Sequence, residues 1–175
     1  MVSNTTELAN ILDRTNDWLK FAEAKNAAIL ILNCAVLFGA LQSLNNEAPL
    51  PLLMEWFLIN LIFFLVAGTI FSAASLISRL NPPLWIKFPA RKANPNILYF
   101  GDISSLSEDS YLVEYYKTLE IQREPSKLDS QYANQIVTNS KIAYIKYRLF
   151  NVSAWLSMCA FLTPLGALYF YMVKA

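Results

Sequence analysis

The sequence predicts an all-α membrane protein, in which three transmembrane helices and their cytoplasmic helical extensions form a helical bundle. Three observations predict this class. Hydrophobic residues make up 55% of the 175 residues and charged residues only 15%, the apolar residues form three long blocks, and the basic residues lie almost entirely to one side of those blocks. A soluble domain of this length lacks the polar surface needed to bury three such helices.

Residues 1–25 are predicted to form a cytoplasmic amphipathic helix. Apolar side chains recur at helical spacing between Leu8 and Ala22, and no glycine or proline separates them from the first apolar block. We therefore expect one helix from about Thr5 to Leu44. Its apolar stripe must be covered, and the segment 81–148 is the only candidate in this chain to cover it.

The three apolar blocks are predicted to span the membrane. Residues 26–80 form a transmembrane hairpin with spans at about 26–44 and 54–79, and residues 149–175 form the third transmembrane helix. The blocks contain uncharged runs of 19, 23 and 25 residues, and about 20 apolar residues suffice to cross a hydrocarbon core about 30 Å thick.

The distribution of basic residues predicts the orientation. Of the 14 lysines and arginines, 13 precede the first span or lie between the second and third spans. Positively charged segments remain in the cytoplasm. The amino terminus is therefore expected in the cytoplasm and the carboxyl terminus outside.

The segment 81–148 is predicted to be a cytoplasmic loop followed by helices. It contains the stretch NPNILYFGDISSL, Asn94 to Leu106, whose glycine is the only one of four outside the apolar blocks. We expect Gly101 to form a turn that a side chain would strain.

Two capping-box patterns predict where the later helices begin. Ser105 with Glu108 predicts a helix that continues to about Arg123, before a proline. Ser126 with Asp129 predicts a further helix, which continues without a break into the third span.

Residue types needed for most enzyme chemistry are missing. The chain has no histidine, and both cysteines lie in predicted spans. We expect no enzymatic activity, no metal site, no cofactor and no nucleic-acid partner. Polar residues within the spans could line a pore or make ordinary interhelical hydrogen bonds. The basic residues could bind a nucleotide or lipid phosphate, although the positive-inside pattern explains them without a ligand.

The order of these features resembles the small membrane effectors of the bacterial Pycsar antiphage systems. The resemblance extends over nearly the whole chain, and its most specific parts are Tyr99 to Ile103 and Lys146 to Leu149. It implies that a separate cyclase senses phage and synthesises cCMP or cUMP, a cyclic pyrimidine mononucleotide. The effector then compromises the bacterial inner membrane and causes abortive infection.

The resemblance does not say which residues hold the nucleotide, and it leaves a rival function open. We expect the ligand-responsive contact near eight residues: Arg91, Lys92, Tyr99, Phe100, Gly101, Asp102, Lys146 and Arg148. Expected partners are membrane lipid, further copies of the chain and the cyclic nucleotide of a partner cyclase. The alternative is a constitutive membrane scaffold or adaptor bundle that binds no nucleotide. Stacking of a pyrimidine on Tyr99 or Phe100 favours the effector. Tight burial of both rings against the amino-terminal helix, with the basic residues facing lipid headgroups, favours the scaffold.

Overall fold

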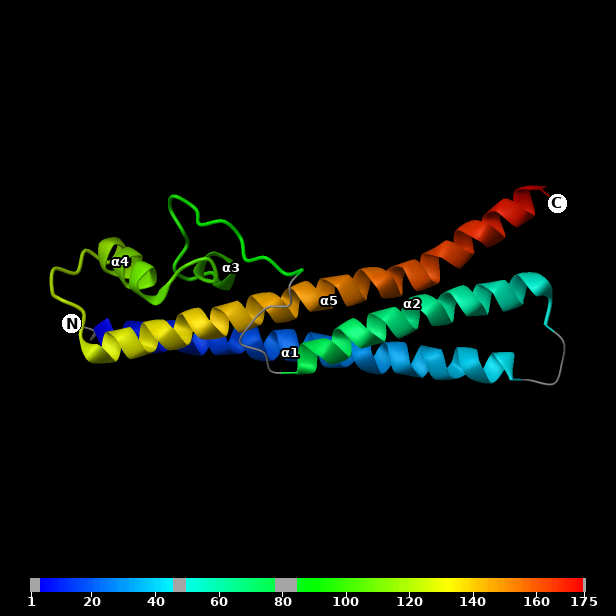
Figure 1. The fold of residues 1–175 in the computed structure, drawn as a ribbon, viewed down its shortest axis with the longest axis horizontal. Helices are drawn as coiled ribbons and strands as arrows, with labels where there is room; N and C mark the ends of the chain where they lie inside the picture. Colours follow the sequence, from blue (N-terminus) through cyan, green and yellow to red (C-terminus); the bar gives the residue numbers. More distant parts are fainter. Residues whose placement is uncertain (1–3, 46–49, 78–84, 175) are drawn as a thin grey trace. The chain divides into compact units, whose positions relative to one another are not determined.

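The computed structural model describes residues 4–45, 50–77 and 85–174, and every regular element in these ranges is a helix (Figure 1). The prediction of an all-α protein is therefore confirmed. The helices are α1 (Asn4–Leu44), α2 (Leu52–Leu76), α3 (Phe100–Ile103), α4 (Glu108–Thr118) and α5 (Lys127–Lys174).

The chain divides into two compact units. The first unit comprises Met1–Glu23 and Ser78–Arg148, and the second comprises Ala24–Ile77 and Leu149–Ala175. Helices α1 and α5 contribute residues to both units. The first unit also contains α3 and α4, and the second contains α2.

The two long helices are uninterrupted, as the sequence predicts. Helix α1 has 41 residues and α5 has 48. The capping box at the start of α5 is formed, because the Ser126 N–H donates to Asp129 Oδ2 (2.8 Å) and the Asp129 N–H donates to Ser126 Oγ (3.2 Å). These reciprocal bonds satisfy two backbone donors and fix the first turn of α5.

Helix α4 begins two residues later than the Ser105 pattern predicts, so that prediction is wrong in detail. The Ser105 hydroxyl donates to the carbonyl of Asp102 (2.7 Å), which commits it to the preceding turn. Ser107 is the N-cap instead, and its Oγ accepts from the N–H of Ser110 (3.2 Å).

Helix α4 also ends at Thr118, before the predicted end at Arg123. Glu120 has a φ of 53°, in the left-handed region that stops a helix. The N–H of Ile121 then donates to the carbonyl of Tyr116 (3.0 Å). This is a bond of the Schellman type, which satisfies a carbonyl at the helix end.

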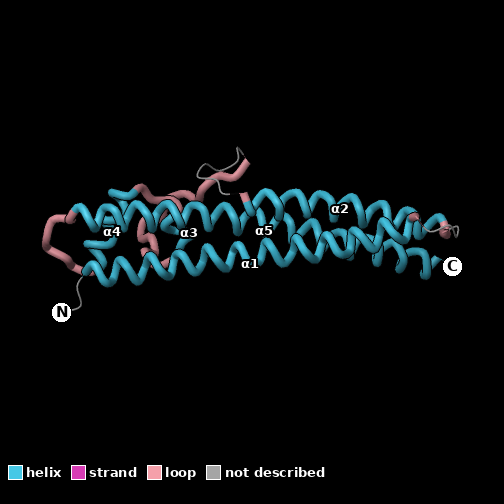
Figure 2. Tube along the Cα trace, turned by 90° about the horizontal axis from the view of Figure 1, so that it is seen from below, coloured by secondary structure: helices cyan, strands magenta, loops and turns pink. Residues whose placement is uncertain are grey.

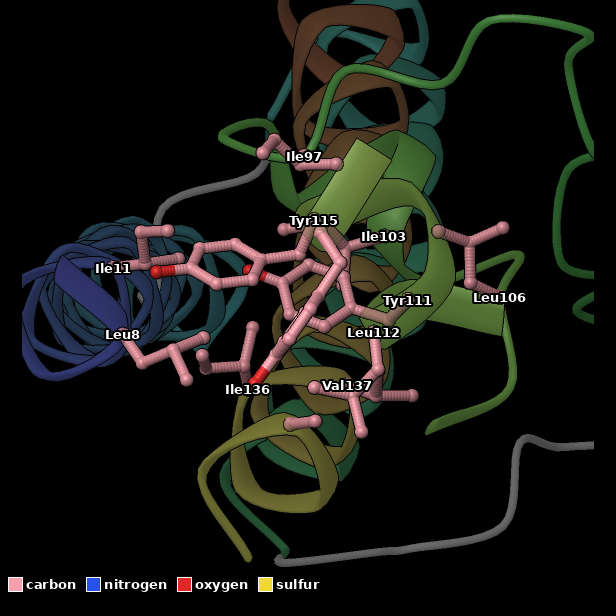
Figure 3. Close-up of a cluster of buried hydrophobic side chains, with 12 residues drawn as sticks. Leu8, Ile11, Ile97, Ile103, Leu106, Tyr111, Leu112, Tyr115, Ile136 and Val137 are labelled. Carbon is pink, nitrogen blue, oxygen red and sulfur yellow. The ribbon is translucent and has the colours of Figure 1, made fainter. Parts of the chain in front are cut away.

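The core of the first unit draws side chains from α1, α3, α4 and α5 and from the loops on both sides of α3 (Figure 3). Leu8 and Ile11 of α1 meet residues of α3, α4 and α5, so the first part of the apolar stripe of α1 is covered within this unit, whereas Trp18 further along the stripe is exposed. The buried cluster contains Leu8, Ile11, Ile97, Ile103, Leu106, Tyr111, Leu112, Tyr115, Tyr116, Ala133, Ile136 and Val137.

The second unit packs α2 against the later part of α1 and the part of α5 around Ser153 to Ala160 (Figures 1 and 2). Leu58, Leu61 and Leu65 of α2 form a buried cluster with Ala40 and Ala160. The spacing of three and four residues in α2 places its leucines on one face of the helix.

Polar side chains in the second unit make hydrogen bonds between helices. The Ser153 hydroxyl of α5 donates to the carbonyl of Gly68 in α2 (2.7 Å). The Ser157 hydroxyl donates to Asn33 Oδ1 of α1 (2.8 Å), and that of Ser72 donates to the Gly68 carbonyl within α2 (3.1 Å). The polar residues of the spans could line a pore or bond between helices. Ser153, Ser157 and Asn33 make hydrogen bonds between helices.

Among the residues that the structure describes, two helices are long and apolar enough to cross a membrane, over Thr6–Leu44 and Leu52–Leu76. The third apolar block lies within α5. A third span and the arrangement of the spans as a bundle stay predictions.

Candidate functional site

The four residues Tyr99 to Asp102 belong to the short helix α3 and its N-cap. Tyr99 precedes the helix with an extended backbone, and the residue is 44% exposed. Phe100, Gly101 and Asp102 are buried. Neighbouring residues of the predicted site therefore have different environments, with one exposed ring and one buried ring.

The buried ring of Phe100 is surrounded by aromatic side chains from α1, α5 and its own N-cap. It stacks on Tyr147 of α5 with ring centroids 5.0 Å apart. Trp18 of α1 lies at 5.5 Å and Tyr99 at 4.9 Å, both tilted to it. The stacking face of Phe100 is thus occupied within the protein, whereas the Tyr99 ring remains accessible.

The expected strained turn at Gly101 is wrong, because no described glycine has a positive φ. Gly101 lies inside α3, and its missing side chain makes room for a neighbouring ring. A Cβ atom at this position would lie 2.5 Å from Cε1 and 2.8 Å from Cζ of Tyr99. The glycine therefore permits the Tyr99 ring to lie against the backbone of α3.

Asp102 holds the loop before α3 through both carboxylate oxygens. Lys92 Nζ lies 2.7 Å from Oδ1, and the N–H of Asn96 donates to Oδ2 (3.0 Å). Burial raises the pKa of Asp102, but the hydrogen bonds from Lys92 and Asn96 and the Lys92 charge outweigh it, so the pKa is lowered. The carboxylate is consequently ionised at neutral pH.

Arg91 attaches the same loop to α4. Its Nη2 lies 3.1 Å from Glu114 Oε1, and its Nη1 donates to Ser110 Oγ (3.3 Å). The side chains of Arg91 and Lys92 are still 50% and 63% exposed. Both cations are therefore positioned by carboxylates yet open to an incoming anion.

The two later basic residues of the predicted site differ from each other. Lys146 is buried, with 4% of its side chain exposed, and its Nζ lies 3.1 Å from Glu23 Oε1 of α1. Arg148 is exposed. The structure thus brings Arg91 and Lys92 onto the carboxylates of α3 and α4, whereas Lys146 pairs with α1.

The sequence did not predict a buried charge network at the start of α5. Asp129 Oδ2 accepts from the Tyr116 hydroxyl and lies against Arg123 Nη1, both at 2.7 Å. Burial raises the pKa of Asp129, but these partners and Ser126 outweigh it and lower the pKa well below its usual range. Burial and the Asp129 carboxylate raise the pKa of Tyr116 to about 12. Only the Ser126 capping pattern marked this position in the sequence.

Comparison with known proteins gives one family. A family model described as the Pycsar effector protein domain matches residues 7–173. The chain is also 32% identical, over 152 residues, to the Pycsar effector protein RsPycTM of a Rhizobium species, and the aligned part covers 85% of each sequence. No solved structure matches the chain.

Proposed function

Since this chain belongs to the Pycsar effector family, and is thus a membrane effector of antiphage defence, we propose that a cyclic nucleotide activates it to disrupt the bacterial inner membrane. The nucleotide is cCMP or cUMP, made by a partner cyclase. The observation that carries this proposal is a family match extending over nearly the whole chain, residues 7–173, which includes both compact units.

The proposed contact for the nucleotide phosphate is the pair Arg91 and Lys92. Both cations are exposed and held by carboxylates, so little side-chain entropy remains to be lost on binding. A phosphate competes with Asp102 and Glu114 for these cations. Binding of the phosphate would loosen the loop from α3 and α4. The ligand then has a higher affinity for the state with the loosened loop than for the state with the loop attached, and a switch requires such a difference.

The remaining residues of the predicted site have supporting roles in this proposal. Tyr99 offers the accessible ring for stacking, and Gly101 positions that ring. Phe100 links α3 to α1 and α5 through its ring contacts. Lys146 links α5 to α1, and the exposed Arg148 is a second phosphate contact.

Disruption of the membrane is proposed to need several copies of the chain, because the predicted spans of one copy are too few for a channel. Mass measurements of the purified full chain with and without cCMP or cUMP test this step. The proposal expects larger assemblies when the nucleotide is present. A strictly monomeric protein at saturating nucleotide would contradict it.

The proposed topology is multi-pass, with the amino terminus in the cytoplasm and the carboxyl terminus outside. The distribution of 13 of 14 basic residues supports it. A reporter enzyme that is active only outside the cytoplasm should be active when fused to the carboxyl terminus. The same reporter inserted at Glu124, in the loop before α5, should be inactive; the reverse pattern would refute the topology.

A constitutive scaffold that binds no nucleotide is the rival function. The burial of Phe100 and the pairing of Arg91 and Lys92 with carboxylates favour it, because these groups already have partners. Expression of the chain in cells together with an active pyrimidine cyclase distinguishes the effector from the scaffold. The effector predicts loss of membrane potential and death, but only when the cyclase is active. Cells that keep their potential and survive would favour the scaffold.

A further inference from the structure

A cavity of about 340 Å³ lies within the first unit, between the start of α1, the loop before α3 and the end of α4. This volume is near the lower end of small-molecule sites, which run from roughly 300 to 1,000 Å³, and it accommodates a single-ring base. The lining residues are Glu7, Ile11, Pro95, Asn96, Ile97, Leu98, Tyr115, Thr118 and Leu119.

The cavity has an apolar floor and a carboxylate at its entrance. Ile11, Ile97 and Tyr115 are buried, whereas Glu7 of α1 and Leu119, just after α4, are exposed. No lysine or arginine is among the lining residues, and none of the ion pairs between described residues involves Glu7. Among the described residues, no cation therefore pairs with the carboxylate of Glu7.

This charge pattern favours the base of a nucleotide over its phosphate. A phosphate is repelled by a carboxylate without a neighbouring cation, whereas a flat base can cover the apolar floor and donate N–H groups to Glu7. Carboxylates accept hydrogen bonds from the exocyclic amine of cytosine, and uracil presents a carbonyl oxygen at that position. The cavity is thus chemically suited to an amine-bearing pyrimidine.

We infer that this cavity binds the base of the activating nucleotide, and that Glu7 makes the site prefer cytosine over uracil. The inference rests on the proposed function, and it places the base beside the proposed phosphate contact. The cavity then takes the place of the Tyr99 ring as the base contact, because Tyr99 does not line it. Asp102 pairs with Lys92 through Oδ1 and accepts the Asn96 N–H through Oδ2, and Asn96 lines the cavity. A bound base would also bridge α1 and α4.

Calorimetry of the full chain in detergent with cCMP and with cUMP tests the inference. Wild type should bind cCMP about tenfold more tightly than cUMP, the range that one well-placed hydrogen-bonding group supplies. Glu7→Gln should abolish this preference, because an amide can pair with either base. Leu119→Trp should fill the cavity and weaken binding of both nucleotides about tenfold or more.

Glu108→Gln is the matched control, since Glu108 is also a glutamate in the first turn of a helix but lies outside the cavity. It should bind both nucleotides like wild type. Glu7 is exposed, so Glu7→Gln remains decisive even if Leu119→Trp fails to fold.

The outcomes separate the two proposals. Binding that neither Glu7→Gln nor Leu119→Trp changes would overturn the cavity assignment and leave the proposed function standing. A wild-type preference for cUMP would overturn the role of Glu7. Wild-type protein that binds neither nucleotide would overturn both proposals.

Discussion

Single carboxylates hold the first unit together at its loops. Asp102 binds the loop before α3, and Asp129 binds Arg123 and Tyr116 at the start of α5. Asp129 is fully buried, and its charge is tolerated because Oδ2 contacts Arg123, the Tyr116 hydroxyl and the Ser126 N–H. Its Oδ1 has no hydrogen-bond partner among the described residues. Changes at such residues affect both stability and its dependence on pH.

The Asp129 network predicts a loss of stability in acid. Its pKa is lowered by folding, so the ionised carboxylate stabilises the protein above its usual pKa of 3.8, and this contribution is lost progressively as the pH falls below that value. Asp129→Asn should reduce the free energy of unfolding at pH 7 by about 2 kcal/mol. Below pH about 4 the difference between the variant and wild type should shrink steadily.

Melting temperatures between about pH 2 and 7 check this prediction, with the exposed Asp13→Asn of α1 as the control. The control should follow wild type throughout. A constant difference between Asp129→Asn and wild type at every pH would contradict the assignment of the acid loss to this network.

The contact between Gly101 and Tyr99 predicts coupled effects of substitution. Gly101→Ala should displace the Tyr99 ring, whose outer atoms would lie within 3.0 Å of the new Cβ. Since Tyr99 is partly exposed, its ring can swing away at a cost of about 1 kcal/mol. In a Tyr99→Ala background the same Gly101→Ala change should be nearly neutral.

Thermal unfolding of the two single variants and the double variant measures this coupling. Additive losses would mean that Gly101 is needed for the backbone itself, as a strained turn would require. The structure assigns the glycine to side-chain packing, so additivity would refute that assignment.

At the scale of helices, sequence patterns predicted the long elements better than the short ones. Helix α1 up to Gly39 and helix α5 up to Pro164 follow from long stretches without glycine or proline, and the start of α5 follows from the Ser126 capping box; these are local signals. Helix α4 was misplaced at both ends. Ser105 bonds to the preceding turn, and the left-handed Glu120 ends the helix although it is not a glycine.

The candidate site was predictable only in part for the same reason. Tyr99 to Asp102 are adjacent in the sequence, so their grouping is trivial. The sequence does not predict which side chains contact them, because Lys92, Trp18 and Tyr147 meet them only through tertiary packing. The cavity beside Glu7 likewise joins α1 to α4, which no local pattern links.

Helix packing in the second unit predicts different effects at two glycines. Gly68→Val should destabilise the protein by about 1–3 kcal/mol, because a Cβ atom there would lie 3.0 Å from Asn33 Nδ2 and 3.3 Å from the Ser153 carbonyl oxygen. Gly39→Val is the matched control in α1, since nothing lies within 4 Å of a Cβ atom at that position.

Melting temperatures in detergent compare the two variants. Gly68→Val should melt well below wild type, and Gly39→Val should melt close to it. Equal destabilisation by both would show that close packing of α2 does not determine the effect, because valine has a higher helix propensity than glycine and propensity alone would not destabilise either variant.

For the whole molecule, two units with different compositions share two helices. The first unit has a core built largely from tyrosines and aliphatic residues and contains the proposed ligand contacts, whereas the second is apolar and contains α2. Because α1 and α5 supply residues to both units, a ligand that alters their packing in the first unit acts on helices that the second unit also uses.

Release of a small dye from liposomes containing the purified full chain tests the central claim most directly. The account predicts that cCMP or cUMP triggers rapid release, that no release occurs without nucleotide, and that Lys92→Gln raises the nucleotide concentration required. No release at saturating concentrations of either nucleotide, or equal release in its absence, would contradict nucleotide-activated disruption of the membrane.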